Sequence, residues 1–252
     1  MARDDVVLEV DAVSKSFGAL AALATVGFTI DQGQVFSVIG PNGAGKSTLF
    51  NVISGLHTPT AGHVRFHGQE ITGWPPEAIS RRGIAKTFQI TNIFPQISVF
   101  ENVRVAAQSR AAVSGRPASL WRLPDVERPA MDLLGVFGLE GRRDEPAQNL
   151  SHGEQRYLEN CLALATDPTL LLLDEPTAGM TPGETRDATA LIQKIARARG
   201  LTVLLIEHDM SVVMGISDRV AVLHFGEKIA EGTPEEIRSN AAVIEAYLGG
   251  AE

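Results

Sequence analysis

A glycine-rich run near the beginning of the chain has the residue types that bind phosphate, in the pattern G-x-x-x-x-G-K-[ST]. Glycines let successive backbone N–H groups turn inward around a phosphate, the lysine adds positive charge beside its outer oxygens, and the serine hydroxyl can ligate Mg²⁺. A ligand-free turn is the alternative, but a predicted strand before the run and a predicted helix after it favour a site for a nucleoside triphosphate with magnesium. The residues assigned to this site are Gly40, Pro41, Asn42, Gly43, Ala44, Gly45, Lys46, Ser47 and Thr48.

Two adjacent carboxylates, Asp174 and Glu175, follow a continuous apolar run over 170–173. Such a run is typical of a parallel strand covered on both faces, which delivers its polar residues to the ligand-binding edge of the sheet. Successive strand residues point to opposite sides, so the two acids can have separate tasks. We predict that Asp174 holds Mg²⁺, directly or through water, and that Glu175 is catalytic, orienting the water that attacks the γ-phosphate. Without the phosphate-binding run, the two acids would more simply mark a strand that runs into solvent.

The stretch LTVLLIEHD (201–209) is the next predicted buried strand, and it repeats this arrangement by ending in Glu207, His208 and Asp209. His208 can donate a hydrogen bond to the γ-phosphate and so respond to its presence. A lone histidine at a strand end is more often an ordinary surface residue. His208 is therefore a candidate only in the company of the other motifs.

The stretch LSHGEQR (150–156) begins a predicted helix. Ser151 and Glu154 have the spacing of a capping box, in which each side chain accepts a hydrogen bond from the other residue's backbone N–H. The start of a helix also collects unpaired N–H groups and the positive end of the helix dipole, so it can hold an anion. From these residues alone, a helix that caps itself and a helix that faces a phosphate are both open.

The composition is that of an ordinary globular protein of 252 residues, 44% hydrophobic and 21% charged. A net charge of −8 without a basic cluster argues against a nucleic-acid partner. The single cysteine, Cys161, excludes an internal disulfide and is expected on the buried face of its helix. No apolar run approaches the ~18–20 residues that cross a bilayer. The acidic first residues lack the apolar core of a signal peptide, so we expect a cytoplasmic protein.

Strand patterns alternate with helix patterns along most of the chain, which predicts an α/β fold with a mostly parallel sheet. The helical stretch 98–149 is predicted to be an inserted lobe. Within it, breaks between helices are expected at Gly115, Pro117, Pro124 and Pro129.

Two helices near the end of the chain have sequence signals at their starts. Thr181, Pro182 and Glu184 predict a capped helix that ends before Gly200. Thr233 and Glu236 form another capping box, which predicts one final helix over 233–249.

These elements in this order resemble the ATP-binding subunit of ABC transporters, over essentially the whole chain. GPNGAGKST matches the Walker A segment, Gln89 in KTFQ the Q-loop, LSHGEQR the signature, LLLLDEP the Walker B segment, and His208 the switch histidine. The resemblance implies a single ABC ATPase domain over 1–252. Residues 1–97 and 150–252 would form the P-loop NTPase core with an N-terminal antiparallel β region, and residues 98–149 the helical subdomain.

The resemblance also implies roles for particular residues toward ATP and Mg²⁺. Gln89 and His208 would act in catalysis beside Glu175, and Gln89 would also be a Mg²⁺ ligand. Phe17 in SKSFG stands where the family stacks an aromatic ring on adenine; a core or surface phenylalanine is the alternative.

In the family, two such domains face each other head to tail, and the signature of one lies over ATP held by the other. A second ATPase subunit is therefore implied, in a homodimer or a heterodimer, with Ser151, Gly153 and Glu154 contacting its nucleotide. We expect Ser151 to cap its own helix when no partner is present and to contact phosphate when the dimer closes. His152 stands where the family commonly has glycine, and Thr181 where it commonly has aspartate.

The stretches 87–103, 178–185 and 206–249 resemble the branched-chain amino-acid importer ATPases, in particular the larger of the two ATPase subunits. Transmembrane permease subunits are then partners, the location is peripheral on the inner face of the plasma membrane, and the chain does not contact the transported solute. ITNIFPQISVFENV (90–103) is the candidate docking surface; packing within the lobe is the alternative. Urea or amide importers, the lipopolysaccharide-exporting ATPase and a soluble iron–sulfur assembly ATPase are alternative family members. A repair or translation ATPase would need a long coiled coil or a second cassette, and the sequence has neither.

Overall fold

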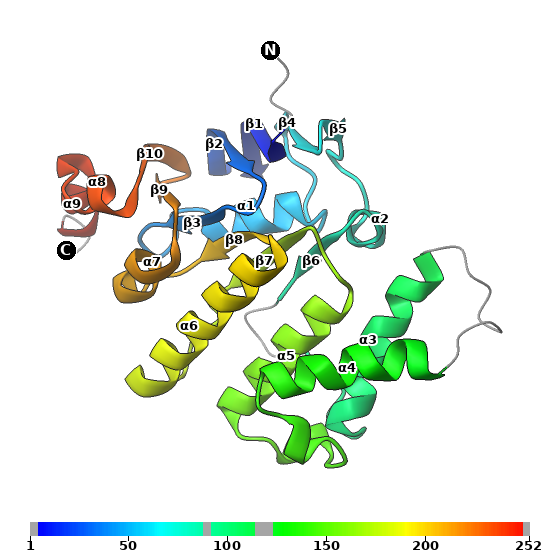
Figure 1. Ribbon diagram of the computed structural model, residues 1–252. Helices are drawn as coiled ribbons and strands as arrows, with labels where there is room; N and C mark the ends of the chain where they lie inside the picture. The colour runs from blue at the N-terminus through cyan, green and yellow to red at the C-terminus, as the bar shows by residue number, and fades with distance from the viewer. Residues whose placement is uncertain (1–4, 88–91, 114–122, 249–252) are drawn as a thin grey trace.

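The structure is a computed structural model that describes residues 5–87, 92–113 and 123–248. Its strands form two sheets, a six-stranded one in the order β10-β9-β3-β8-β7-β6 and a four-stranded one in the order β2-β1-β4-β5 (Figure 1). The strands are β1 Val6–Phe17, β2 Leu20–Asp31, β3 Val35–Ile39, β4 Ala61–Phe66, β5 Gln69–Glu70, β6 Ile84–Lys86, β7 Leu170–Asp174, β8 Thr202–Ile206, β9 Arg219–His224 and β10 Glu227–Gly232.

Helices cover both faces of the six-stranded sheet, and the helical lobe lies to one side of it (Figure 1). The α-helices are α1 Lys46–Ile53, α2 Pro76–Arg81, α3 Val99–Val113, α4 Leu123–Val136, α5 His152–Ala165, α6 Pro182–Arg199, α7 Met210–Ile216, α8 Pro234–Arg238 and α9 Ala241–Leu248.

The centre of the six-stranded sheet is parallel, as the alternating pattern predicted. Strands β6, β7, β8, β3 and β9 run in one direction, and β10 returns antiparallel to β9. The sheet is covered on both faces: Leu170 and Leu172 enter the core on the side of α1 and the smaller sheet, whereas Leu171 and Leu173 enter the core formed with α5 and α6. This is why β7 reads as an unbroken apolar run. The carboxyl ends of β3, β7 and β8 meet at one edge, which positions the candidate residues.

The smaller sheet is antiparallel and lies next to the turn between β9 and β10. Strand β1 pairs with both β2 and β4. The N–H of Ala24 in β2 donates to the carbonyl of Gly226 at 2.8 Å, and the N–H of Gly226 donates to the carbonyl of Ala44 at 3.0 Å. This chain of hydrogen bonds fixes the phosphate-binding run between the two sheets.

The lobe contains α3 and α4, both packed on α5. The expected break at Pro129 is wrong, because this proline lies inside α4, whereas α4 begins at Leu123, beside the break expected at Pro124. Pro124 is in the first turn, where no intrahelical N–H bond is lost. Pro129 does remove such a bond, but the helix still buries Val126, Ala130, Leu133 and Leu134. Gly115 and Pro117 lie outside the described residues. The boundaries at 98 and 149 stay a prediction; α5 contacts both the lobe and the sheet core.

The end of the chain forms two helices, so the expectation of one final helix is wrong. The capping box of Thr233 and Glu236 starts α8 as predicted. The helix ends at Arg238, and the side chain of Asn240 then accepts hydrogen bonds from the N–H groups of Ala242 and Val243, at 3.0 and 3.3 Å. Asparagine is a good helix starter, and here it begins α9 in a new direction.

Candidate nucleotide-binding site

The phosphate-binding run forms the loop between β3 and α1, and its backbone conformation requires glycine at two points. Gly40 has φ +150°, and a Cβ there would lie 2.1 Å from the carbonyl oxygen of Leu223. Gly45 has φ +101°, and its Cβ would lie 2.5 Å from the carbonyl oxygen of Ala22. The loop therefore passes so close to β9 and β2 that a side chain at either position would displace it.

Helix α1 starts without a side-chain cap, and no acidic residue lies in its first turn. By contrast, α5, α6 and α8 each begin with a complete capping box. Ser47 is exposed and Thr48 half-buried in the first turn of α1. The N–H groups and the positive dipole end of α1 thus remain available to an anion, which suits a phosphate.

The ammonium of Lys46 donates hydrogen bonds to the carbonyl oxygens of Gly40 and Pro41, at 2.7 and 3.0 Å. Its residue is only 8% exposed. Burial lowers the pKa of Lys46, and the negative charges of Glu175 and Asp174 act in the opposite direction. The fold has therefore brought the lysine of the loop and the two carboxylates, far apart in sequence, into electrostatic contact.

Asp174 is buried at the end of β7, 7% exposed, and its N–H donates to the hydroxyl of Thr87 at 3.3 Å. Burial raises the pKa of this carboxyl, and the positive charge of Lys86 is the largest opposing effect. The negative charge of a buried carboxylate is stabilised by nearby cations. A bound divalent cation can supply part of this stabilisation, so Asp174 is suited to hold one.

Glu175 has a left-handed backbone, φ +49°, and its N–H donates to the carbonyl of Ile206 at 3.0 Å. Such a conformation is unfavourable for a residue with a Cβ, and it recurs at active sites. It directs the chain out of the sheet directly after β7. Oε1 of Glu175 lies 3.7 Å from Nδ1 of His208, whose side chain is 61% exposed.

A buried glutamate, Glu207, fixes the segment that carries His208. Its Oε2 accepts hydrogen bonds from the N–H groups of His208 and Asp209, at 3.1 and 3.4 Å. Its Oε1 accepts from the hydroxyl of Thr177 at 2.6 Å, in the loop after Glu175. The sequence assigned no role to Glu207, because an acid next to His208 gives no sign that it is buried and 1% exposed. Lys86 was also missed, because nothing in the sequence shows that its charge lies near Asp174.

Phe17 lies at the end of β1, paired with Leu20 of β2, and is 44% exposed. The ammonium of Lys15 lies 4.9 Å from the centre of its ring. The ring of His57 lies edge-on to it, with 5.2 Å between the ring centres. The alternative of a core phenylalanine is therefore wrong, whereas the alternative of a surface phenylalanine stays open. Gln89 lies outside the described residues.

The start of α5 caps itself, as one of the two sequence interpretations expected. The N–H of Glu154 donates to Oγ of Ser151 at 3.3 Å, and the N–H of Ser151 donates to Oε2 of Glu154 at 2.8 Å. The backbone N–H of Ser151, helped by its hydroxyl and by the charge of Arg142, holds the pKa of Glu154 below its ordinary value. Arg142 also donates to Oε1 of Glu154 at 3.2 Å.

Within one chain, His152 and Gly153 of the signature lie against the loop before α6 and the first turn of α6. A Cβ on Gly179 would lie 3.1 Å from Nε2 of His152, and a Cβ on Gly153 would lie 3.4 Å from Oε1 of Glu184. Among the described contacts, none joins Ser151 or Gly153 to the phosphate-binding loop. The structure thus unites the phosphate loop, the carboxylates and His208, and leaves the signature apart from them.

Comparison with known proteins decides the family. A family model described as ABC transporter matches residues 23–178, a span that includes the phosphate-binding loop, the signature and both carboxylates. The chain is an ATP-binding cassette of the ABC transporter family. The cassette binds nucleotide, and its ATPase activity drives transport.

The cassette is 43% identical to the high-affinity branched-chain amino acid transport ATP-binding protein BraF of Pseudomonas aeruginosa, over 97% of this chain and 98% of that protein. It is similar in structure to an ATP-binding cassette of an ABC transporter in its ADP conformation, with a TM-score of 0.85, 31% identity and coverage of 97% and 99%. A dimeric cassette bound to ADP and phosphate in a post-hydrolysis state matches with a TM-score of 0.78, 26% identity and coverage of 90% and 98%. A second family model, described as Branched-chain amino acid ATP-binding cassette transporter, matches residues 227–252. None of the described helices is both long and apolar enough to cross a membrane.

Proposed function

We propose that this cassette powers the import of branched-chain amino acids through a pair of permease subunits. The observation that carries the proposal is the 43% identity to BraF over nearly the full length of both chains. The match of residues 227–252 to a branched-chain amino acid transporter model supports the same solute class. The cassette itself has no contact with the solute, so its energy reaches the permeases through motion.

The phosphate-binding site is proposed to hold ATP with Mg²⁺. Lys46 exchanges its carbonyl partners for the β- and γ-phosphate oxygens, and the uncapped start of α1 receives the phosphates. Ser47 and Asp174 would hold Mg²⁺, and Gln89 would be a further ligand. Hydroxyl, carboxylate and phosphate oxygens are the hard donors that Mg²⁺ prefers. When bound, the ion neutralises charge on the β- and γ-phosphates. Phe17, whose ring is partly exposed, is assigned to stack on adenine.

Hydrolysis is assigned to Glu175 and His208. Glu175 orients and polarises the attacking water, and His208 contacts the γ-phosphate from the neighbouring strand end. Their 3.7 Å separation supports a joint action on one water and one phosphate. The hydrogen bonds to Glu207 keep the backbone of His208 in place while its exposed side chain turns.

Two cassettes are proposed to close head to tail, with Ser151, Gly153 and Glu154 of each facing ATP on the other. The separation of the signature from the phosphate loop within one chain supports this arrangement, because a single chain leaves the signature without a phosphate. Binding of ATP closes the dimer, and hydrolysis opens it. The permeases dock on a surface that includes residues 92–103, where Phe94 and Ile97 are exposed, and this docking places the cassette at the inner face of the plasma membrane.

The proposal is tested by reconstituting the cassette in proteoliposomes with candidate permease subunits and a solute-binding protein. We expect ATP enclosed with the cassette to drive uptake of leucine, isoleucine and valine, and the E175Q variant to abolish it. Uptake of urea or short amides in place of these amino acids would overturn the solute assignment. Full ATPase activity without any uptake of solute would overturn the transport role.

A further inference from the structure

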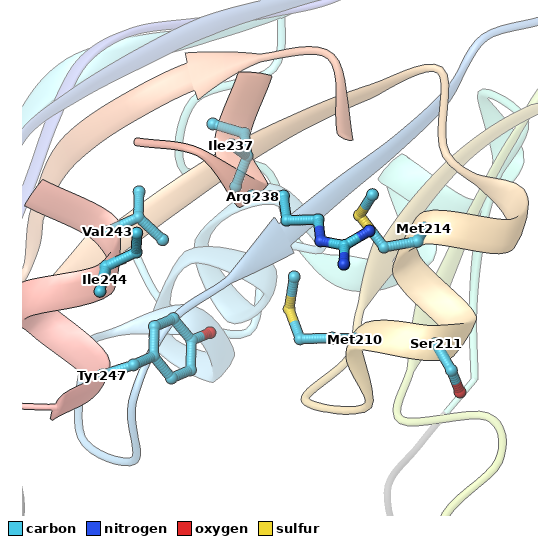
Figure 2. A pocket seen from close by; sticks show the side chains of 8 residues that line it. All are labelled: Met210, Ser211, Met214, Ile237, Arg238, Val243, Ile244 and Tyr247. Carbon is cyan, nitrogen blue, oxygen red and sulfur yellow. The ribbon is translucent and has the colours of Figure 1, made fainter. Parts of the chain in front are cut away.

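A cavity of about 480 Å³ lies at the C-terminal end of the molecule, between α7, α8 and α9 (Figure 2). Its walls are mainly apolar, with Met210 and Met214 from α7, Ile237 from α8 and Val243 and Ile244 from α9. Its volume lies within the range that small-molecule ligands occupy, and such sites are typically apolar with a few polar groups. None of the residues assigned to the nucleotide site lines it.

One charged side chain, Arg238 at the end of α8, lines this cavity among the residues that the structure describes. Figure 2 shows its guanidinium extending toward the two methionines of α7. Within the described part of the chain, the side chain of Arg238 makes no hydrogen bond or ion pair, and no carboxylate lines the cavity. Ser211 and Tyr247 provide the remaining polar atoms.

We propose that this cavity binds a small amphipathic carboxylate, with an aliphatic body and no ammonium group, and that its binding is linked to nucleotide binding. The aliphatic body would replace water against the methionines and isoleucines. The carboxylate would bind the guanidinium of Arg238, a charge-assisted interaction. An amino acid fits less well, because its ammonium would lose water without gaining an acidic partner.

The linkage follows from what the walls of the cavity contact. The phenol of Tyr247 lies close enough to the backbone N–H of Gly40, the first residue of the phosphate loop, for that N–H to oppose the effect of burial on the pKa of Tyr247. Met210 begins α7 directly after Asp209, which caps that helix and follows His208. A ligand between α7 and α9 therefore contacts two helices. Helix α9 carries Tyr247, which lies by the phosphate loop, and α7 follows His208 in the chain. This linkage rests on the proposed function, whereas binding of the carboxylate does not.

Calorimetric titration of the full chain with octanoate, octanol and leucine tests the site. We expect octanoate to bind about tenfold or more tightly than either of the others, since only octanoate has both the aliphatic body and an unopposed carboxylate. R238Q should weaken octanoate about tenfold or more and leave octanol unchanged. R81Q is the matched control, because Arg81 is likewise exposed at the end of a short helix, α2, away from the cavity.

Filling the cavity gives a second test. M214W should abolish binding of octanoate, with circular dichroism and the melting temperature showing that the chain remains folded. Octanoate that binds R238Q as tightly as the unchanged chain would overturn the proposal, as would leucine that binds as tightly as octanoate. Dimerisation lost in M214W at every octanoate concentration would make the cavity an interface between copies of the chain and would also overturn it.

The linkage is measured in the E175Q background, in which ATP remains intact. We expect octanoate to change the ATP dissociation constant, and ATP to change that of octanoate by the same factor, because linkage is reciprocal. Y247F should reduce this factor toward one. Tight octanoate binding with an unchanged ATP affinity would overturn the linkage. If the unchanged chain does not bind ATP in the absence of octanoate, this result would instead contradict the proposed function.

Discussion

Nδ1 of His208 lies 3.7 Å from Oε1 of Glu175, although 32 residues separate them along the chain. Their proximity follows from the register of two parallel strands, in which Asp174 at the end of β7 pairs with Ile206 of β8. Each side chain follows the end of its strand by one or two residues. A change at the end of either strand should therefore alter the positions of both residues. The hydrogen bond from Thr177 to Glu207 connects the two loops that follow these strands.

Replacing Glu175 with glutamine should separate nucleotide binding from hydrolysis. The amide keeps the shape of the side chain but cannot accept a proton from the attacking water, so the hydrolysis rate should fall about a hundredfold to ten-thousandfold. ATP affinity should change little. Phosphate release and a fluorescent-nucleotide titration measure the two effects, and E227Q, at the exposed first residue of β10, is the control. Normal turnover by E175Q would remove Glu175 from the mechanism.

Ser151→Ala should have two separable effects. Loss of the helix cap should cost about 1 kcal/mol of unfolding free energy. Nucleotide binding by an isolated cassette should remain nearly intact, whereas hydrolysis should be strongly impaired, because the phosphate that Ser151 contacts belongs to a second subunit. T233A removes the equivalent cap of α8 and is the matched control for stability. Equal losses of binding and hydrolysis in S151A would contradict the trans contact.

The charge of Glu154 should make part of the stability depend on pH. Its folded-state pKa lies below the ordinary value of 4.5, chiefly because the N–H of Ser151 donates to it. A lowered folded-state pKa stabilises the fold above the unfolded-state pKa, and this contribution disappears as pH falls through the folded-state value. E154Q should therefore lower the melting temperature at neutral pH and approach the unchanged chain in acid. E245Q, on an exposed part of α9, should show no such convergence.

Gly179→Ala should destabilise the loop that follows the Walker B segment. Gly179 has φ +78°, which costs alanine about 1 kcal/mol, and the new Cβ would lie 3.1 Å from Nε2 of His152. Adding H152A should restore the steric part of the loss but not the backbone part. A double-mutant cycle on unfolding free energies separates the two. Strict additivity would show that His152 does not restrain this loop.

Cys161 should be chemically inert in the folded cassette. It is fully buried on α5, and burial raises the pKa of its thiol above the ordinary value, so little thiolate is present. A thiol reagent such as Ellman's should react with it only after denaturation. Rapid labelling of the native chain would mean that α5 opens frequently from the sheet.

The sequence was most informative where consecutive residues do the chemistry. The phosphate loop, the two acids after β7 and the capping boxes at Ser151, Thr181 and Thr233 could be identified because each depends on residues within a few positions of one another. The short elements α2 and β6 were missed because so few residues carry no clear periodicity. The prediction at Pro129 was wrong for a related reason. The local propensity of proline favours a break in the helix, but burial of the apolar residues of α4 stabilises the helix by more than the proline costs.

By itself, then, the sequence determined the chemical class of the site, since phosphate binding needs glycines, a lysine and a helix start in unbroken succession. Only the tertiary structure decided which side chains share an environment: Glu175 with His208, Lys46 with Asp174, Glu207 with Thr177, and Arg238 with the cavity beside α9. The physical reason is that burial, pKa shifts and ion pairing depend on distances in space. Those distances are set by strand register and helix packing between segments far apart along the chain.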